Sequence, residues 1–241
     1  MDRITCEIET GVAIVRMDDG KVNAIESDWC ENLNRVLDEA ERAEGAAAVV
    51  LFGRPGCFCA GLDRKRLPML SPQDLRATTG AFVAAMERVF LFPKPVIAAS
   101  AGHALAGGLM LYLAADVRLA LEDASSRYGL PEVSQGIPLI GPTAAICAAG
   151  IPLAQHAELL LHGRRLSARE AFERALVHEL VVDTDTLERR ALSRARELRG
   201  LDPAAYRASK RALRGPLLDA ARAAATSVGG DLPKGNPFRR A

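Results

Sequence analysis

Two glycine-rich segments are the parts of this sequence whose residue types could position a reacting group. Residues 54–63 read RPGCFCAGLD and residues 100–110 read SAGHALAGGLM. Small residues let backbone N–H groups approach a ligand closely, and Gly107 and Gly108 also open a predicted helix, whose N-terminus favours negative charge. Two such segments could direct two N–H groups at one oxygen atom, forming an oxyanion hole that suits chemistry through an enolate. The simpler alternative is that the glycines only permit tight turns.

Other ligand-binding loops and metal sites fit the sequence less well. Neither glycine-rich segment has the G-x-G-x-x-G spacing of a dinucleotide site or the Gly-Lys-Ser/Thr sequence of a phosphate-binding loop. Cys57 and Cys59 lie close together, but no second pair of Cys or His residues at ligand spacing joins them. We therefore expect no metal site.

Glu132 is the carboxylate that we expect to act as a base. Apolar residues surround it in the sequence, namely Leu130, Val133, Ile137 and Leu139, and they favour a position in a pocket. Burial of that kind raises the pKa of a carboxyl group, which then exchanges its proton closer to neutral pH. The alternative is a solvated loop carboxylate, because most Glu side chains lie at protein surfaces.

The elements that must position these residues alternate between strands and helices, which is typical of an α/β fold. Alternating apolar residues on either side of Thr10-Gly11 predict a hairpin, and Ser27 is the expected N-cap of the next helix. Each glycine-rich segment follows a predicted buried strand, where α/β proteins place ligands. The predicted strands are 4–8, 12–17, 49–52, 96–99, 117–121 and 177–182, and the predicted helices are 72–90, 107–115, 142–149, 153–161, 168–174, 187–198 and 204–213, besides the one from Ser27.

The composition is that of an ordinary globular protein. The 241 residues, 49% of them hydrophobic and 25% charged, fit one α/β domain with an appended helical piece. A formal net charge of +1 gives no strong field toward nucleic acid or an anionic membrane. We find neither an apolar run of the roughly 18 residues that a membrane span needs nor a secretory signal. Five cysteines at irregular positions argue against a disulfide framework, so we expect a cytoplasmic protein.

Several short motifs together resemble the enoyl-CoA hydratase/isomerase family, also called the crotonase family. They occur in the family's order and with its spacing, and they span most of the predicted α/β core. The motifs are residues 22–24 (VNA), 58–63 (FCAGLD), 94–108 (KPVIAASAGHALAGG), 116–118 (DVR) and 129–138 (GLPEVSQGIP).

This resemblance implies a fold, a substrate class and roles for particular residues. The implied fold is a spiral of ββα units, and the implied substrate is an acyl thioester of coenzyme A (CoA), with no further cofactor. By position, the backbone N–H groups of Leu62 and Gly107 are the oxyanion donors, and Ala60 and Asp63 lie along the pantetheine and adenine portions. The expected substrate-binding residues are Ala60, Gly61, Asp63, Gly108 and Met110.

One departure from the family's pattern bears on the reaction. Hydratases of the family use two glutamates to hold and activate water, and here the first of these positions is Met110 while the second is Glu132. Hydration needs paired acid/base groups, whereas one carboxylate can take a proton from C2 of a 3-enoyl thioester and return it at C4. The family's Δ3,Δ2-enoyl-CoA isomerases have such a single glutamate. We predict an isomerase; a hydratase-like enzyme with an atypical substrate and a catalytically silent acyl-CoA-binding protein are the alternatives.

Other polar residues near the motifs have simpler interpretations. His103 is expected to pack or to line the CoA site, Tyr128 to be a core aromatic residue, and Asp63 to cap a helix. Three lysines could meet CoA phosphates, although a solvated position is the simpler interpretation for each. These lysines are Lys21, Lys65 and Lys210.

We divide the chain into a crotonase-like core at residues 1–183, a helical region at 184–228 and a loose tail at 229–241, which is rich in Gly, Pro and Arg. The helical region is amphipathic, and its apolar stripes are expected to exceed what one core can cover. In line with the resemblance, we expect these helices to join copies of the chain into a homotrimer or hexamer.

Overall fold

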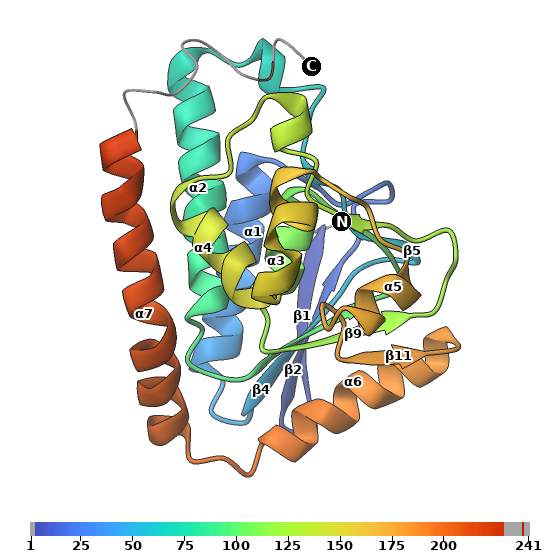
Figure 1. Ribbon diagram of the computed structural model, residues 1–241. Helices are drawn as coiled ribbons and strands as arrows, with labels where there is room; N and C mark the ends of the chain where they lie inside the picture. The colour runs from blue at the N-terminus through green and yellow to red at the C-terminus, as the bar shows by residue number, and fades with distance from the viewer. Residues whose placement is uncertain (1–2, 229–237, 239–241) are drawn as a thin grey trace.

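A six-stranded sheet forms the centre of the computed structural model, which describes residues 3–228 and residue 238 (Figure 1). The strand order is β1-β2-β4-β7-β9-β11. Strands β1 and β2 are antiparallel, and every other neighbouring pair is parallel. The strands are β1 (Ile4–Glu9), β2 (Val12–Met17), β4 (Ala48–Phe52), β7 (Val96–Ser100), β9 (Val117–Leu121) and β11 (Glu179–Val181).

The predicted hairpin is confirmed, and its turn explains the register. Thr10 and Gly11 both have positive φ, at 46° and 85°, which is the backbone conformation of the tight turns that match the twist of antiparallel strands. Glu9 therefore pairs with Val12, and Ile4 pairs with Met17 at the far end.

The central strands β4 and β7 are buried on both faces of the sheet, which explains their continuous apolar runs. Along β4, Val49 and Leu51 join the larger hydrophobic core, whereas Ala48, Val50 and Phe52 join a second core on the opposite face. This alternation follows from the period of two residues in a strand. The larger core is covered by α1 (Ser27–Arg42), α2 (Pro72–Phe90), α3 (Gly107–Ala114) and α4 (Gly141–Gly150), and the second by α6 (Thr184–Leu198).

Two small sheets carry the glycine-rich segments. One has the order β10-β8-β5 and consists of β5 (Gly56–Cys59), β8 (Gly102–Leu105) and β10 (Tyr128–Gly129). The other pairs β3 (Ala24–Ile25) with β6 (Gly61–Leu62). The predicted loop at 128–141 thus contains β10, and it also holds a 3₁₀ turn at Val133–Gln135 directly after Glu132. Parallel pairing of β5 and β8 brings the two segments side by side.

Several element boundaries differ from the prediction. Ser27 is the first residue of α1 rather than its N-cap, which is Glu26, and the Ser27 hydroxyl instead lies 2.9 Å from that of Thr78. The stretch predicted as a helix at 153–161 is a 3₁₀ turn (Leu153–Gln155) followed by a π-helix (Ala157–Leu161). The helix α5 (Ala168–Glu173) begins as predicted, with a capping box between Ser167 and Glu170.

The two helices after Asp183 behave differently. On α6, Leu187, Ala191 and Ala195 are buried against the chain's own sheet, whereas Leu192 and Leu198 are only partly buried, so the core covers this stripe in part. The helix α7 (Pro203–Val228) runs beyond the predicted 204–213 and stands at the edge of the molecule beside α4 (Figure 1). It leaves Leu213 and Leu217 exposed.

The predicted tail at 229–241 lies outside the described residues, with the exception of Phe238. Among the helices that the structure describes, we find none whose length and apolar character would let it cross a membrane.

Candidate functional site

The two glycine-rich segments are in direct backbone contact. A Cβ atom added to Gly108 would lie 1.9 Å from the carbonyl oxygen of Cys59, and one added to Gly61 would lie 2.8 Å from the backbone nitrogen of Gly107. Because no side chain fits at these distances, the glycines are required for the close approach and not only for turns. The segments therefore bring Leu62 and Gly107, the two expected donor residues, to one place.

The backbone before Gly107 is held in an unusual conformation. Ala106 has φ 51° and ψ −129°, a region that residues other than glycine rarely adopt and that is common at functional sites. Its carbonyl oxygen accepts hydrogen bonds from the backbone N–H groups of Leu109 and Met110, at 2.9 and 3.1 Å. The peptide N–H of Gly107 lies in the first turn of α3, where N–H groups have no helical partner and can serve a ligand.

A buried asparagine fixes the first segment. The Asn23 side-chain amide donates to the carbonyl oxygens of Met17 and Phe58, at 2.8 and 3.0 Å. Its own amide oxygen accepts from the N–H of Asp19 at 3.0 Å. The Cys59 thiol donates to the Asn23 carbonyl oxygen at 3.0 Å. The early Asn-Ala motif thus ties the end of β2 to β5, just before the expected donor Leu62.

The two segments open onto a cavity of about 320 Å³, here called the Glu132 cavity. It is lined by Ala60, Leu62, Gly107, Met110 and Glu132, all of which were predicted site residues. Most of the remaining wall is apolar. That wall includes Phe82, Val83, Ile137, Leu139 and Ile140.

Glu132 is buried, which excludes the alternative of a solvated loop carboxylate. Glu132 is only 8% exposed, and its Oε2 atom has no hydrogen-bond partner among the described residues. Burial penalises the charged form and raises the pKa of the Glu132 carboxyl from 4.5 to about 7. A backbone N–H group opposes this effect only in part. The carboxyl can therefore both accept and release a proton near neutral pH.

Met110 occupies the position at which the motif resemblance predicts the first glutamate of a hydratase. It is 4% exposed and lines the same cavity. Among the described residues of the cavity wall, Glu132 is the one carboxylate. A thioether neither accepts nor delivers a proton, so the acid/base chemistry of this cavity rests on a single group.

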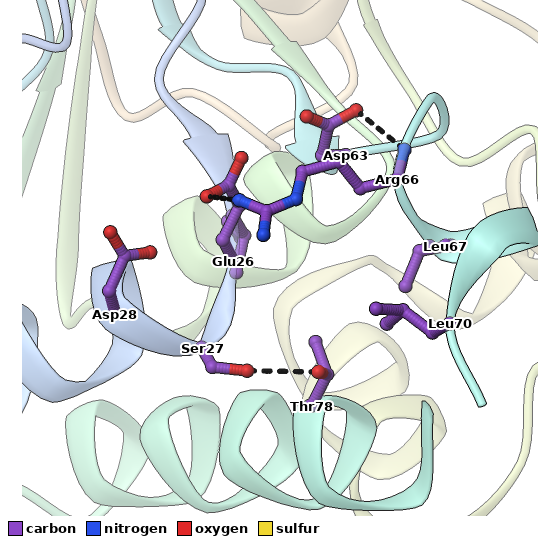
Figure 2. A pocket seen from close by; sticks show the side chains of 9 residues that line it. Glu26, Ser27, Asp28, Asp63, Arg66, Leu67, Leu70 and Thr78 are labelled. Atoms are coloured by element: carbon purple, nitrogen blue, oxygen red, sulfur yellow. Dashed lines mark hydrogen bonds and ion pairs between the residues drawn. The ribbon is translucent and has the colours of Figure 1, made fainter. Parts of the chain in front are cut away.

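Three predicted substrate-binding residues do not line the Glu132 cavity. Gly61 and Gly108 are buried between the two backbone segments. Asp63 faces a second cavity of about 340 Å³, here called the Glu26 cavity, which Figure 2 shows from close by. The Asp63 carboxylate accepts the backbone N–H groups of Lys65 and Arg66, at 2.8 and 3.3 Å, which is the hydrogen-bond pattern of a cap, in a turn that leads into a 3₁₀ helix at Leu67–Met69.

The polar groups of the Glu26 cavity largely satisfy one another. The carboxylate of Glu26 is ion-paired with Arg66, and the hydroxyl groups of Ser27 and Thr78 are hydrogen-bonded (Figure 2). This wall therefore offers fewer free groups to a ligand than the Glu132 cavity does.

The other candidates have structural partners. The Nδ1 atom of His103 accepts the backbone N–H of Arg127 at 3.0 Å, and Tyr128 is a buried core residue, as predicted. The interpretation of Lys210 as a solvated lysine is wrong: it is 6% exposed, and its Nζ lies 2.7 Å from Oδ2 of Asp116. It therefore anchors α7 to the core and is not available to a CoA phosphate.

Sequence reasoning missed several residues of the Glu132 cavity. These are Arg64, Thr79, Phe82, Val83, Gln135, Ile140, Thr143 and Phe238. Position relative to the motifs could have indicated two of them, because Arg64 follows the expected donor Leu62 by two residues and Gln135 follows Glu132 by three. The others belong to helices or helix caps or lie near the C-terminus, and no local sequence pattern predicts that these segments reach the cavity. Among the described residues, we find no cluster of His, Cys, Asp and Glu that could hold a metal ion.

The architecture is that of the crotonase fold. One protein of Mycobacterium tuberculosis, described in one solved structure as an enoyl-CoA isomerase in its apo form and in another as a probable enoyl-CoA hydratase, superposes with TM-scores of 0.86 and 0.85. Both structures are 26% identical to this chain, and the matches span 95% and 96% of this chain and 99% of that one. Human mitochondrial Δ3-Δ2-enoyl-CoA isomerase superposes with a TM-score of 0.82 at 22% identity, over 95% and 88% of the two chains, and so supports the fold alone.

The chain belongs to the enoyl-CoA hydratase/isomerase family, whose model matches residues 7–228. A probable enoyl-CoA hydratase of Bacillus subtilis is 35% identical over 181 residues, which are 73% of this chain and 68% of the relative. The resemblance inferred from the motifs is thereby confirmed, and the protein is an enzyme of this family.

Proposed function

We propose that this enzyme moves the double bond of a 3-enoyl-CoA thioester to position 2. The observation that supports this proposal most directly is the single buried carboxylate, Glu132, beside Met110 in one cavity with the expected oxyanion donors. A hydration site would need a second acid/base group to orient and activate water. A proton shuttle needs only one such group, provided that it can be charged before the reaction and neutral during it.

The proposed reaction uses groups that the fold already positions. The thioester oxygen accepts hydrogen bonds from the backbone N–H groups of Leu62 and Gly107. The Glu132 carboxylate takes a proton from C2, and the electrons of that C–H bond pass into a dienolate whose charge rests on the held oxygen. The carboxylic acid then returns the proton to C4, and the double bond forms between C2 and C3.

The surroundings of Glu132 suit such a shuttle. A group with a pKa of about 7 loses and regains a proton with little bias at neutral pH. The apolar wall, with Met110, Phe82 and Ile140, disfavours a bound water molecule that could add to the double bond.

Two other functions make different predictions. Relatives such as the Bacillus subtilis protein are named as hydratases, which favours a hydratase-like reaction on an unusual substrate as the second candidate. A silent acyl-CoA-binding protein would bind acyl-CoA thioesters without isomerising or hydrating them.

The test is the variant Glu132→Gln, which keeps the size of the side chain but cannot accept the proton. We expect isomerisation of 3-enoyl-CoA to fall by about 10²–10⁴-fold, while affinity for a saturated acyl-CoA persists. The matched control is Glu173→Gln, at an exposed glutamate of α5. Unchanged turnover in Glu132→Gln would remove Glu132 as the base. A parent enzyme that binds acyl-CoA but turns over no 3-enoyl-CoA would overturn the isomerase proposal.

A further inference from the structure

The Glu132 cavity contains polar side chains that the proposed isomerisation does not use. Most of the wall is apolar, but Arg64 and Gln135 line it as well. A plain hydrocarbon chain would need neither residue, because Glu132 moves the proton and backbone N–H groups hold the oxygen. Arg64 and Gln135 therefore bear on which acyl chain the cavity accepts.

Arg64 brings an uncommitted positive charge to this cavity. It lies two residues after Leu62, so its Cα is within about 7 Å of the Cα of that residue. The residue is exposed, and among the described residues its guanidinium has no hydrogen-bond or ion-pair partner. Its neighbours differ, since Asp63 faces the Glu26 cavity and Arg66 pairs with Glu26.

Gln135 adds a second uncommitted donor. It ends the 3₁₀ turn that follows Glu132 and is half-buried, and its side-chain amide is not hydrogen-bonded to any described residue. The two threonines of the wall differ from it. Thr79 donates to the carbonyl oxygen of Leu75 at 2.8 Å, and Thr143 donates to that of Ile140 at 3.2 Å.

Arg64 and Glu132 line the same cavity, but Arg64 is exposed and Glu132 is buried. Burial and a backbone N–H group account for the raised pKa of Glu132, and no arginine contributes to it. A cation beside Glu132 would stabilise the carboxylate and lower that pKa. The raised pKa of Glu132 therefore gives no sign of a cation paired with its carboxylate.

Resting on the proposed function, we propose that Arg64 binds a carboxylate carried by the acyl chain, with Gln135 donating a second hydrogen bond. The preferred substrates would then be thioesters of dicarboxylic acids rather than of plain fatty acids. A guanidinium matches a carboxylate in shape and charge, and such charge-assisted bonds are strong beside an apolar wall. A phosphate of CoA would offer similar chemistry. Arg64 shares its cavity with Glu132 and Gln135, and free CoA in the experiment below distinguishes a CoA phosphate from an acyl-chain carboxylate.

The test compares two saturated thioesters that differ only at the chain end, adipoyl-CoA and hexanoyl-CoA, by calorimetric titration. We expect the parent enzyme to bind adipoyl-CoA more tightly. Arg64→Leu should weaken adipoyl-CoA binding by about 10- to 100-fold, the range for a hydrogen bond to a charged group, and leave hexanoyl-CoA within about twofold. Gln135→Leu should weaken adipoyl-CoA binding by about 2- to 10-fold. Arg76→Leu, at an exposed arginine of α2 outside the cavity wall, is the matched control and should change neither affinity.

Each contrary result has a distinct meaning. Equal losses for adipoyl-CoA, hexanoyl-CoA and free CoA in Arg64→Leu would assign Arg64 to a CoA phosphate and overturn the proposal. If Arg64→Leu had the melting temperature of the parent and unchanged affinities for both thioesters, the proposed role of Arg64 would be overturned as well. Because these thioesters cannot react, the binding result is independent of turnover. A clear preference for adipoyl-CoA in an enzyme that does not isomerise 3-enoyl-CoA would refute the proposed isomerisation but would still support the carboxylate-binding role of Arg64.

Discussion

Replacing Glu132 with Gln should stabilise the folded chain above neutral pH, although it removes the proposed base. Burial raises the pKa of this carboxyl from 4.5 to about 7, so the folded chain holds the proton more tightly than the unfolded chain does. Between these two pH values the unfolded chain has released its proton while the folded chain keeps it. The contribution of Glu132 to stability therefore falls as the pH rises through this range.

The size of the effect follows from the two pKa values. One pKa unit corresponds to about 1.4 kcal/mol, so a carboxyl that moves from 4.5 to about 7 costs the fold about 3 kcal/mol once it is charged in both states. Gln has a similar size and stays neutral at every pH. The free energy of unfolding of Glu132→Gln, relative to the parent, should therefore rise from about pH 4.5 and level off above pH 7, at about 3 kcal/mol over its acid value.

Urea unfolding followed by circular dichroism between pH 5 and pH 8 measures this difference. Parent and variant must be compared at one protein concentration, because any assembly adds to the apparent stability. Glu173→Gln, at an exposed glutamate, serves as the control. If the difference between Glu132→Gln and the parent stayed flat across this range, the carboxyl would not be held in a site that disfavours its charge, and the reasoning would fail.

Three further predictions concern the reaction, the assembly and the anchoring of α7. The rate at which this enzyme hydrates crotonyl-CoA should be about 10²–10⁴-fold below the rate of a two-glutamate enzyme. Met110→Glu should raise that rate. Robust hydration by the parent in a spectrophotometric assay would contradict the isomerase proposal. Leu213 and Leu217 of α7 are 75% and 44% exposed, and we expect them to lie at the interface of a trimer-based oligomer. Leu213→Glu should therefore lower the mass measured by light scattering. A parent protein that is monomeric at micromolar concentration would contradict this prediction. Lys210→Met should cost about 1.5–3 kcal/mol in urea unfolding, because Asp116 loses one charged partner but keeps Arg214 and the backbone N–H of Val96. A loss below about 1 kcal/mol, typical of an exposed pair, would show that the pair is solvated.

Where local chemistry determines an element, the sequence was sufficient to predict it. The helix α2 begins at Pro72 as predicted because the Ser71 hydroxyl accepts the backbone N–H of Asp74 at 3.1 Å, and it ends at Phe90 shortly before Pro93. The helix predicted at 204–213 was too short, since α7 continues through Gly215-Pro216, a pair that commonly ends a helix. Tertiary contacts override that preference: Leu218, beyond the proline, is fully buried in the main core.

In the candidate site too, residues within local motifs were predicted, and residues placed by contacts between distant segments were not. Glu132, Leu62 and Gly107 were predicted from motifs, and the fold brings them to one cavity. The position of Lys210 was mispredicted because its partner, Asp116, lies 94 residues away in the sequence and no local pattern indicates the pair. The polar part of the wall was missed for a similar reason, since a cavity wall is assembled by packing between distant segments.

The contact between the two glycine-rich segments also has a consequence for how the enzyme folds. Neither segment can form its half of the site alone, because Gly108 packs on the carbonyl group of Cys59 and Gly107 packs on Gly61. Contacts between segments so far apart in sequence form late, after the local helices, because a long loop must first be closed. During refolding, helical circular dichroism should therefore recover before acyl-CoA binding does. The binding site is then a reporter of the last steps of folding rather than of the first.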